Sequence, residues 1–188
     1  MKSLDLIRWS GLAAAIAAAL FIVINLTALL SSSFGQGTFG LLVRNVISPV
    51  SGTLLVLGLI GLYARQSEAT RQSGATDVIG LVGFLFALFG TVLALAGNVW
   101  ANLLAYFGWA LFGVSSLQAR VYPPTAAVFL TIGALIAAPF STPVAGASSV
   151  LVYMGTGASI IFNGAVAWLG LVLFLGRSVA AEQTPKEG

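Results

Sequence analysis

Long apolar runs separated by short polar gaps dominate the chain between Trp9 and Gly176. Most of these runs approach the roughly 20 residues that an α-helix needs to cross a bilayer. Charged residues fall in the gaps rather than at membrane depth. The pattern predicts an all-α polytopic bundle of six transmembrane helices within one integral membrane domain, residues 1–188, with spans at about 9–30, 46–64, 78–97, 101–118, 125–140 and 150–176.

The third and fourth predicted spans share one apolar run of about 40 residues. A single helix of that length would reach about 60 Å, roughly twice the hydrocarbon thickness, so the run must turn. Gly97 and Asn98 are residues typical of a tight turn. Pro123 and Pro124 suit the first turn of the following helix, where a missing N–H costs least.

Composition explains why lipid is the expected solvent. The chain is 59% hydrophobic and only 7% charged, whereas a soluble domain carries about 25% charged residues. The mean hydropathy is +1.03. The run at 9–30 exceeds the roughly 7–15 apolar residues of a signal peptide, so we expect it to be retained as a span.

The basic residues predict the orientation. Six crossings place seven of the eight Lys and Arg on one face and leave Arg44 alone on the other. By the positive-inside rule the basic face is cytoplasmic. We therefore expect a multi-pass cell (inner) membrane protein with both termini in the cytoplasm, a cytoplasmic loop at 65–77 and a flexible cytoplasmic tail at 178–188.

Residues at the ends of the spans are expected to anchor the helices at the membrane interfaces. Arg44 precedes Arg65 by about 31 Å of helix, which matches one bilayer core, so both side chains can reach opposite surfaces. An outer-face headgroup contact is the alternative for Arg44. The predicted anchors are Arg44, Arg65, Arg120, Arg177, Trp9 and Trp100.

Two spans end with the same spacing of residues. Gly58 to Arg65 and Gly113 to Arg120 share G-x-x-small-L-x-A-R, and Gly170 to Arg177 repeats the Gly-to-Arg interval. Three repeated helical hairpins, or convergence of helix ends, would explain this. Stripes of small residues such as Gly11, Ala15 and Ala19 predict close helix packing, with a substrate path between helices as the alternative.

Several classes of chemistry lack the residues that they require. The chain has no Cys and no His, which removes thiol catalysis and the commonest metal ligand and general base. No carboxylate lies within a predicted span, and Asp77 reads as the N-cap of the third one. We expect no enzymatic activity, no cofactor and no bound metal.

The remaining candidates are amides and hydroxyls at membrane depth. Asn163 lies near the middle of the sixth predicted span and needs a polar partner, so it should face the bundle. Polar side chains at a similar or more outward depth predict either a pocket for a small neutral molecule or interhelical hydrogen bonds alone. The set is Asn25, Asn98, Asn102, Tyr106, Tyr153, Thr156, Ser159 and Asn163.

Three segments carry a resemblance. LYARQ at 62–66, GLVGFLFALFG at 80–90 and LFGVSSLQARVYP at 111–123 resemble uncharacterised small multi-span integral membrane proteins of bacteria. The resemblance covers about the middle half of the chain. It implies a bacterial membrane protein and brings no known activity and no functional residues.

Two functions fit these observations. The first is a non-catalytic membrane protein, either a structural or accessory subunit or a binder of lipid or another hydrophobic ligand, with a tightly packed bundle. The second is a transporter or channel for a small neutral or hydrophobic solute, with a cavity lined by Asn25, Ser159 and Asn163. Expected partners are membrane lipids and a membrane-protein partner or a second copy of the chain, and not nucleic acid.

Overall fold

The computed structural model describes residues 3–30, 37–72, 77–98, 100–141 and 149–176, and every regular element in these ranges is helical. The α-helices are α1 (Ser3–Leu30), α2 (Gly37–Leu42), α3 (Ser48–Gln72), α4 (Val78–Leu95), α5 (Ala101–Ala119), α6 (Pro124–Ala137) and α7 (Ser149–Leu175). A π-helical turn, η1 (Val43–Ile47), joins α2 to α3, and a 3-10 turn, η2 (Ala138–Phe140), extends α6.

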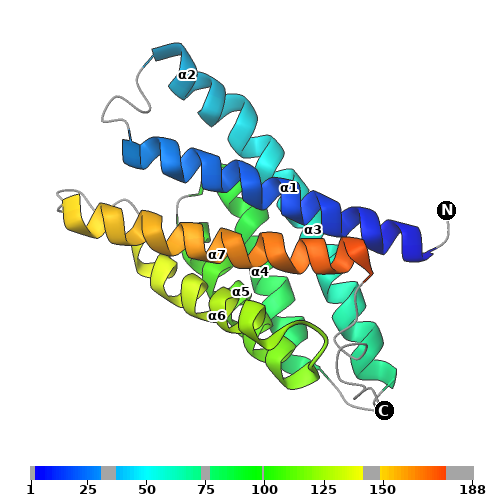
Figure 1. Ribbon diagram of the computed structural model, residues 1–188. Helices are drawn as coiled ribbons and strands as arrows, with labels where there is room; N and C mark the ends of the chain where they lie inside the picture. Colours follow the sequence, from blue (N-terminus) through cyan, green and yellow to red (C-terminus); the bar gives the residue numbers. More distant parts are fainter. Residues whose placement is uncertain (1–2, 31–36, 73–76, 99, 142–148, 177–188) are drawn as a thin grey trace, which may run out of the picture.

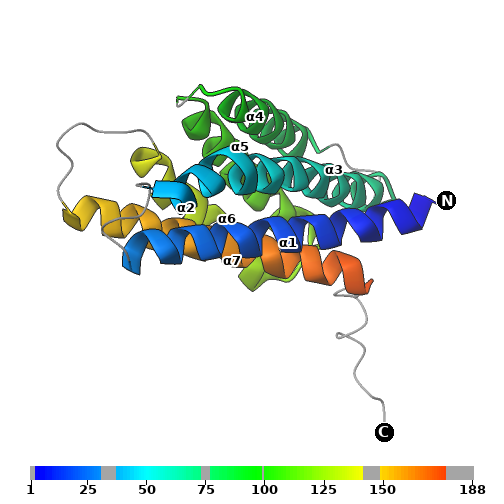
Figure 2. The same ribbon diagram turned by 90° about the horizontal axis from the view of Figure 1, so that it is seen from above.

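The six long helices form a closed ring. Each contacts its two neighbours in the order α1–α3–α4–α5–α6–α7, and α7 returns to α1 (Figures 1 and 2). The three pairs that follow one another along the chain, α1 with α3, α4 with α5 and α6 with α7, all pack together. The seam between α3 and α4 is the least extensive of the ring.

Glycine lets the helices of the ring approach closely. A Cβ on Gly11 would lie 2.7 Å from the carbonyl oxygen of Gly170, so α1 and α7 meet backbone to backbone. A Cβ on Gly108 of α5 would lie even closer to the backbone nitrogen of Ala87 on α4. Such approaches increase van der Waals contact between helices, which is the main attraction where lipid replaces water.

The local signals at three helix ends agree with the structure. The Asp77 carboxylate accepts a hydrogen bond from the Gly80 amide at 2.7 Å and caps α4. Gly97 has a φ of +92° in the turn between α4 and α5, a conformation that glycine adopts without strain. Pro124 is the first residue of α6.

The helices run longer than the hydropathy predicts. α1 begins at Ser3 rather than at residue 9, and α3 continues to Gln72 rather than ending at 64. Residues 65–72 of the predicted cytoplasmic loop are therefore helical, and the tail at 178–188 lies outside the described residues. Polar residues can extend a helix beyond the apolar run, because helix formation and burial in lipid are separate requirements.

The helical run that starts at Gly37 reaches α3 through the π-helical turn. Pro49 has no N–H to donate to the preceding turn, and its ring crowds the carbonyl four residues earlier. The backbone widens there, and the Ser48 amide donates to the Val43 carbonyl instead. This widened turn shifts the register of the helix immediately before the residues of α3 that line the bundle's interior.

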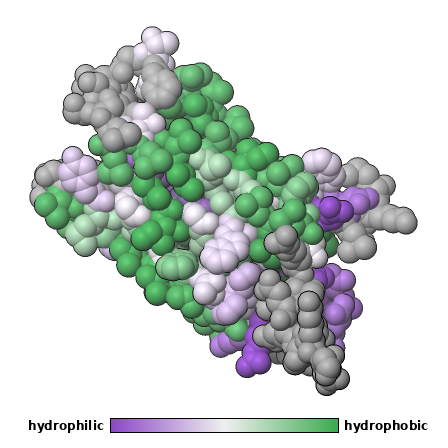
Figure 3. Space-filling view, viewed as in Figure 1, coloured by the Kyte–Doolittle hydropathy of each residue, from purple (hydrophilic) through white to green (hydrophobic). Residues whose placement is uncertain are grey.

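The surface is apolar around the ring and polar at one end. Figure 3 shows hydrophobic residues over most of the visible face, with the hydrophilic ones gathered towards one end. Among the described residues, four segments are long and apolar enough to cross a membrane: Asp5–Thr27, Gly40–Gln72, Val78–Leu95 and Tyr153–Leu175. Pro124–Phe140 is a shorter apolar helix. The helices are compatible with a membrane protein.

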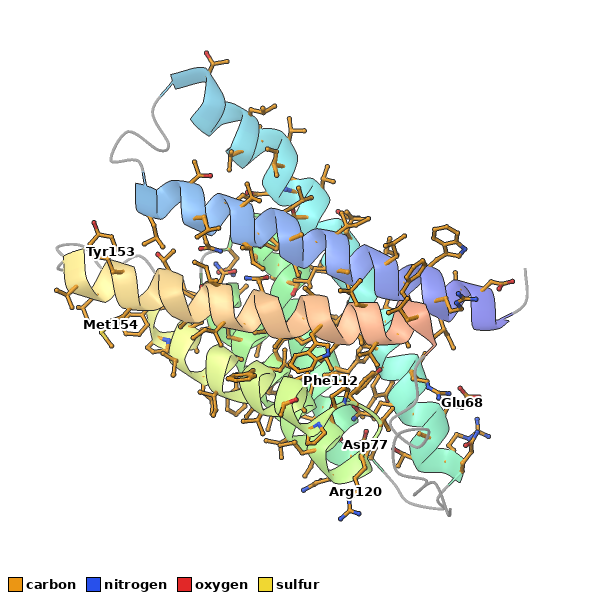
Figure 4. The ribbon with its side chains drawn as sticks, viewed as in Figure 1. Glu68, Asp77, Phe112, Arg120, Tyr153 and Met154 are labelled. Atoms are coloured by element: carbon orange, nitrogen blue, oxygen red, sulfur yellow. The ribbon has the colours of Figure 1, made fainter. Side chains whose placement is uncertain are left out.

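The polar end is defined by the charged side chains. Glu68, Asp77 and Arg120 lie together there, far from Tyr153 and Met154 at the other end of the bundle (Figure 4). Arg8, near the start of α1, donates to the carbonyl of Phe174 near the end of α7 at 3.1 Å. We call this the charged end and the opposite one the apolar end.

Candidate functional site

A partly open cavity of about 310 Å³ lies inside the ring, in the half nearer the apolar end. It is lined by residues of α1, α3, α4, α5 and α7. Five of the eight polar residues predicted from the sequence line it: Asn25, Asn102, Tyr106, Ser159 and Asn163. Side chains that are far apart in the chain thus meet in one space, and Ser48 and Thr91 add two hydroxyls to it.

Asn163 faces the bundle and is almost fully buried, with 3% of its surface exposed. Its Nδ2 donates to the backbone carbonyl of Ser159 at 2.7 Å, one turn earlier on α7. Its Oδ1 is buried and has no hydrogen-bond partner among the described residues. The orientation of the amide follows from chemistry, because a carbonyl oxygen at 2.7 Å can only be met by a donor.

Two further polar groups in the cavity donate to their own helices in the same way. Asn25 Nδ2 donates to the Phe21 carbonyl at 2.8 Å, and Thr91 Oγ1 donates to the Ala87 carbonyl at 2.7 Å. A threonine hydroxyl has one proton, so Thr91 can only accept from a molecule in the cavity. Asn25 and Asn163 each keep an acceptor oxygen and a second amide N–H, whereas Thr91 keeps only its acceptor lone pairs.

Aromatic side chains form the floor of the cavity towards the charged end. Trp109 and Phe162 both line it, and their ring centroids are 5.6 Å apart in an edge-to-face arrangement. Phe112, fully buried, packs edge-on against Trp109 with centroids 5.9 Å apart. Tyr106 packs on Phe162, and its hydroxyl lies 3.4 Å from Ser159 Oγ. The floor is therefore apolar, with one hydroxyl pair beside it.

No charged side chain lines the cavity among the residues that the structure describes. Within the same ranges, no group of three or more His, Cys, Asp or Glu is placed to hold a metal ion. A charged molecule would lose its hydration there without a counter-charge, which costs several kcal/mol or more. The cavity is therefore suited to neutral molecules.

Three of the predicted polar residues do not line the cavity. Asn98 lies in the turn between α4 and α5, where its Oδ1 accepts from the Trp100 amide at 3.1 Å. Tyr153 is 57% exposed near the start of α7 (Figure 4). Thr156 is half-buried on the same helix. Similar depth along the chain grouped these three residues with the others, but Asn98 lies in a turn, and Tyr153 and Thr156 do not face the cavity.

Four of the six predicted anchors can be placed, and they lie near the two ends of the bundle. Trp9 near the charged end and Trp100 near the apolar end are both exposed. Arg65 is paired with Glu68 at 3.6 Å, and Arg120 ends α5 in a left-handed conformation with a φ of 52°. The side chain of Arg44 and the whole of Arg177 lie outside the described part of the chain.

Sequence reasoning missed a buried polar network below the aromatic floor. Gln66 on α3 has 0% of its surface exposed. Its Nε2 donates to Asp77 Oδ2 at 2.6 Å and to Ser115 Oγ at 2.7 Å, and its Oε1 accepts from Ser116 Oγ at 2.7 Å. Ser115 also donates to Asp77 Oδ1. We call these four residues the inner polar network.

One signal could have pointed to this network. Gln66 directly follows Arg65, and Ser115 and Ser116 stand a few residues before Arg120, so all lie at a similar depth near the ends of the second and fourth predicted spans. Polar groups at one depth in lipid must find one another, because no water is available. The predicted cytoplasmic loop at 65–77 leaves Gln66 in water, so it does not predict a buried partner for this side chain.

Comparisons with known proteins return nothing. No protein-family model matches the chain, no curated protein matches it and no solved structure matches it.

Proposed function

We propose that this chain is a six-span integral membrane protein that binds a small, neutral, largely apolar molecule in the cavity near its apolar end. Both termini are cytoplasmic in this proposal, and the apolar end faces the opposite side of the cell (inner) membrane. The binding is non-catalytic. The single observation that carries the proposal is the cavity of about 310 Å³ whose lining includes Asn163, a residue whose buried Oδ1 has no hydrogen-bond partner in the described part of the chain.

The exposed apolar surface supports insertion into lipid. Large hydrophobic side chains are exposed on all sides of the ring, including Leu57, Phe89, Phe107, Phe129 and Leu171. Such an area far exceeds the few hundred Å² of apolar patch that soluble monomers tolerate. The grouping of Arg8, Arg65 and Arg120 at one end supports the orientation, because basic residues favour the cytoplasmic side.

The cavity favours ligand binding over a purely structural role. A subunit that only packs against others needs no internal space, and each empty volume forfeits van der Waals contacts. Here five helices leave a cavity lined by both apolar and polar groups. Ligand sites have this composition, with a few polar atoms fixing the orientation of a mainly apolar molecule.

Binding can be tested with two isomeric neutral probes, 4-fluorobenzyl alcohol and 4-fluoroanisole. The protein is purified in lipid nanodiscs, and broadening of the probes' ¹⁹F resonances is titrated. We expect saturable broadening that is lost in Ala94→Trp, which fills the cavity from α4. Ile132→Trp, at an exposed site on α6, is the matched control. Equal broadening in all three proteins would mean that the probes dissolve only in the lipid.

Membrane topology has its own test. The chain contains no Cys, so single cysteines at Asn98 and Gln72 report cleanly. Both positions are exposed, the first after α4 and the second at the end of α3. We expect an impermeant maleimide to label Asn98→Cys from outside intact cells and Gln72→Cys only after the cells are opened. Labelling of both from the same side would contradict the six-span arrangement.

A transporter is the second candidate, because polar side chains from five helices line a partly open cavity. Trp109 and Phe162 line it and contact each other, and the inner polar network ties α3, α4 and α5 together nearer the charged end. Solute passage requires that network to open. A disulfide between Gln66→Cys and Ser116→Cys should then stop uptake into proteoliposomes while binding persists. Persistent uptake in the cross-linked protein would argue against a path through this region.

A further inference from the structure

The polar groups of the cavity differ in what they can offer to a ligand. Asn163 and Asn25 each commit an amide N–H to a carbonyl of their own helix, at 2.7 and 2.8 Å, and Thr91 commits its single O–H in the same way at 2.7 Å. The three residues come from α7, α1 and α4, so this is not a property of one helix. Each retains an oxygen lone pair, and each Asn also retains a second amide N–H.

Among these groups, Asn163 Oδ1 is the one with an unmet requirement. This oxygen is fully enclosed and accepts no hydrogen bond from the described residues. Asn163 as a whole has 3% of its surface exposed. A buried acceptor without a donor is costly, and native structures contain few of them. Asn163 is one of the residues that line the cavity, so a molecule bound there can supply the missing donor after a small adjustment of this side chain.

From this geometry we infer that the ligand is an uncharged small molecule carrying an O–H or N–H donor on an apolar body, and that Asn163 Oδ1 accepts that hydrogen bond. The inference deepens the proposed function and rests on it. A donor that is also cationic fits poorly, because none of the cavity's described lining residues is acidic. Ethers, esters without donors and hydrocarbons can fill the space but leave the acceptor unpaired.

The shape of the cavity positions the rest of such a ligand. Phe162 lines the cavity one residue before Asn163, with Trp109 beside it and Leu55 on the facing α3. An apolar body can pack on these rings while its donor reaches Asn163. An aromatic or branched alcohol or a small amide has this arrangement of groups, which is typical of molecules that fit mixed pockets.

The test compares 4-fluorobenzyl alcohol, which donates a hydrogen bond, with its isomer 4-fluoroanisole, which cannot. Both are titrated by ¹⁹F broadening in nanodiscs against the wild type and Asn163→Leu. For each protein we take the ratio of the two probes' dissociation constants. Comparing this ratio between the wild type and the variant cancels the different solubility of the probes in lipid. In Asn163→Leu we expect the affinity for the alcohol to fall about tenfold relative to that for the ether, because one buried hydrogen bond is lost.

Two further variants make the result interpretable. Asn25→Leu changes a second acceptor group in the cavity and should reduce the preference for the alcohol by a smaller factor. Thr53→Val removes the same type of side chain-to-helix hydrogen bond at an exposed site on α3, so it should leave the preference unchanged. A melting curve for each variant shows that the comparison is made on folded protein.

The outcomes separate the inference from the proposed function. If both probes bind in the cavity but Asn163→Leu leaves their preference unchanged, the donor requirement is wrong and an enclosed water satisfies Asn163. If Ala94→Trp abolishes the binding of neither probe, the proposed binding function is wrong, and the donor requirement fails with it. A loss of preference in Thr53→Val as large as in Asn163→Leu would also overturn the assignment.

Discussion

The side-chain amide of Gln66 donates to the carboxylate of Asp77 at 2.6 Å and so joins the last turns of α3 to the N-cap of α4. This bond lies at the seam of the ring where the helices contact each other least. Ser115 and Ser116 extend the connection to α5. A polar network, rather than packed apolar surface, therefore closes the ring at the charged end.

Removal of the Asp77 carboxylate should destabilise the protein through two effects. Asp77→Ala removes the N-cap of α4 and leaves the buried Gln66 amide with one partner fewer. We expect the free energy of unfolding in detergent to fall by about 2–3 kcal/mol. Asp77→Asn keeps a capping oxygen but places an NH₂ group opposite neighbouring donors. Its free energy of unfolding should therefore lie between that of Asp77→Ala and that of the wild type.

The control for that measurement is the exposed ion pair nearby. Glu68 lies 3.6 Å from Arg65, and both side chains are substantially exposed. Glu68→Gln should change stability by no more than about 0.5 kcal/mol. A loss in Glu68→Gln equal to that in Asp77→Ala would mean that general charge, and not the network, stabilises this end.

Two glycine-to-alanine substitutions should have opposite effects. Gly108 has no room for a Cβ because the backbone of Ala87 lies against it, whereas a Cβ on Gly164 meets nothing within 4 Å. Gly108→Ala should separate α4 from α5 and cost about 1–3 kcal/mol. Gly164→Ala should be neutral or stabilising by up to about 1 kcal/mol. Thermal unfolding in detergent measures both, and equal effects would contradict the packing of α4 on α5.

Tyr122 should confer a stability that is lost in strong alkali. It is buried in the connection between α5 and α6, and its hydroxyl donates to the Leu62 carbonyl at 2.7 Å. Burial raises the pKa of Tyr122 far above its ordinary value of 10.0, although Arg65 acts in the opposite direction. Above that ordinary value the unfolded state ionises while the folded state does not, which favours unfolding.

The measurement compares the wild type with Tyr122→Phe across pH. Below about pH 10 the wild type should be more stable by about 0.5–1.5 kcal/mol, because it keeps the hydrogen bond to α3. That advantage should shrink as the pH rises further, since only the wild type gains an ionised form when unfolded. A constant difference up to pH 12 would mean that this hydroxyl is open to water.

Asn163→Leu should stabilise the ligand-free protein or leave its stability unchanged. Leucine has a similar size and removes an acceptor that is buried without a partner among the residues that the structure describes. Correcting such a defect is worth about 1–3 kcal/mol, less the loss of the bond to Ser159. Thermal unfolding without added ligand measures this. A strong destabilisation would indicate that Asn163 serves packing rather than binding, because residues kept for function are commonly costly to stability.

The sequence predicted the ends of most helices because their signals are local. Asp77, Gly97 and Pro124 each act through the backbone within one turn, and each has the predicted role. The prediction was wrong for residues 65–72, where Gln66 is buried and Thr70 donates back to its carbonyl at 3.0 Å. Hydropathy ends a span where polar residues begin, but a helix can continue when those residues find buried partners.

The candidate site was predictable in depth but not in direction. Asn25 and Asn102 lie in the outer parts of their predicted spans and Asn163 near the middle of its span, and all three line one cavity. Asn98 and Tyr153 also lie towards the outer end but do not line it. Hydropathy along a chain predicts how far each residue lies from the membrane surface. It does not predict which way a side chain points, because rotating a helix about its axis leaves the hydropathy profile unchanged.

By itself, the sequence determined the helical class, the approximate positions of the apolar helices and the absence of charge at the level of the cavity, because each depends on local composition. Only the tertiary structure decided the ring order and the direction in which Asn163 points. Those depend on which surfaces fit closely, as Gly11 fits Gly170 and Gly108 fits Ala87. Complementarity of this kind belongs to pairs of helices and is not encoded in either one alone.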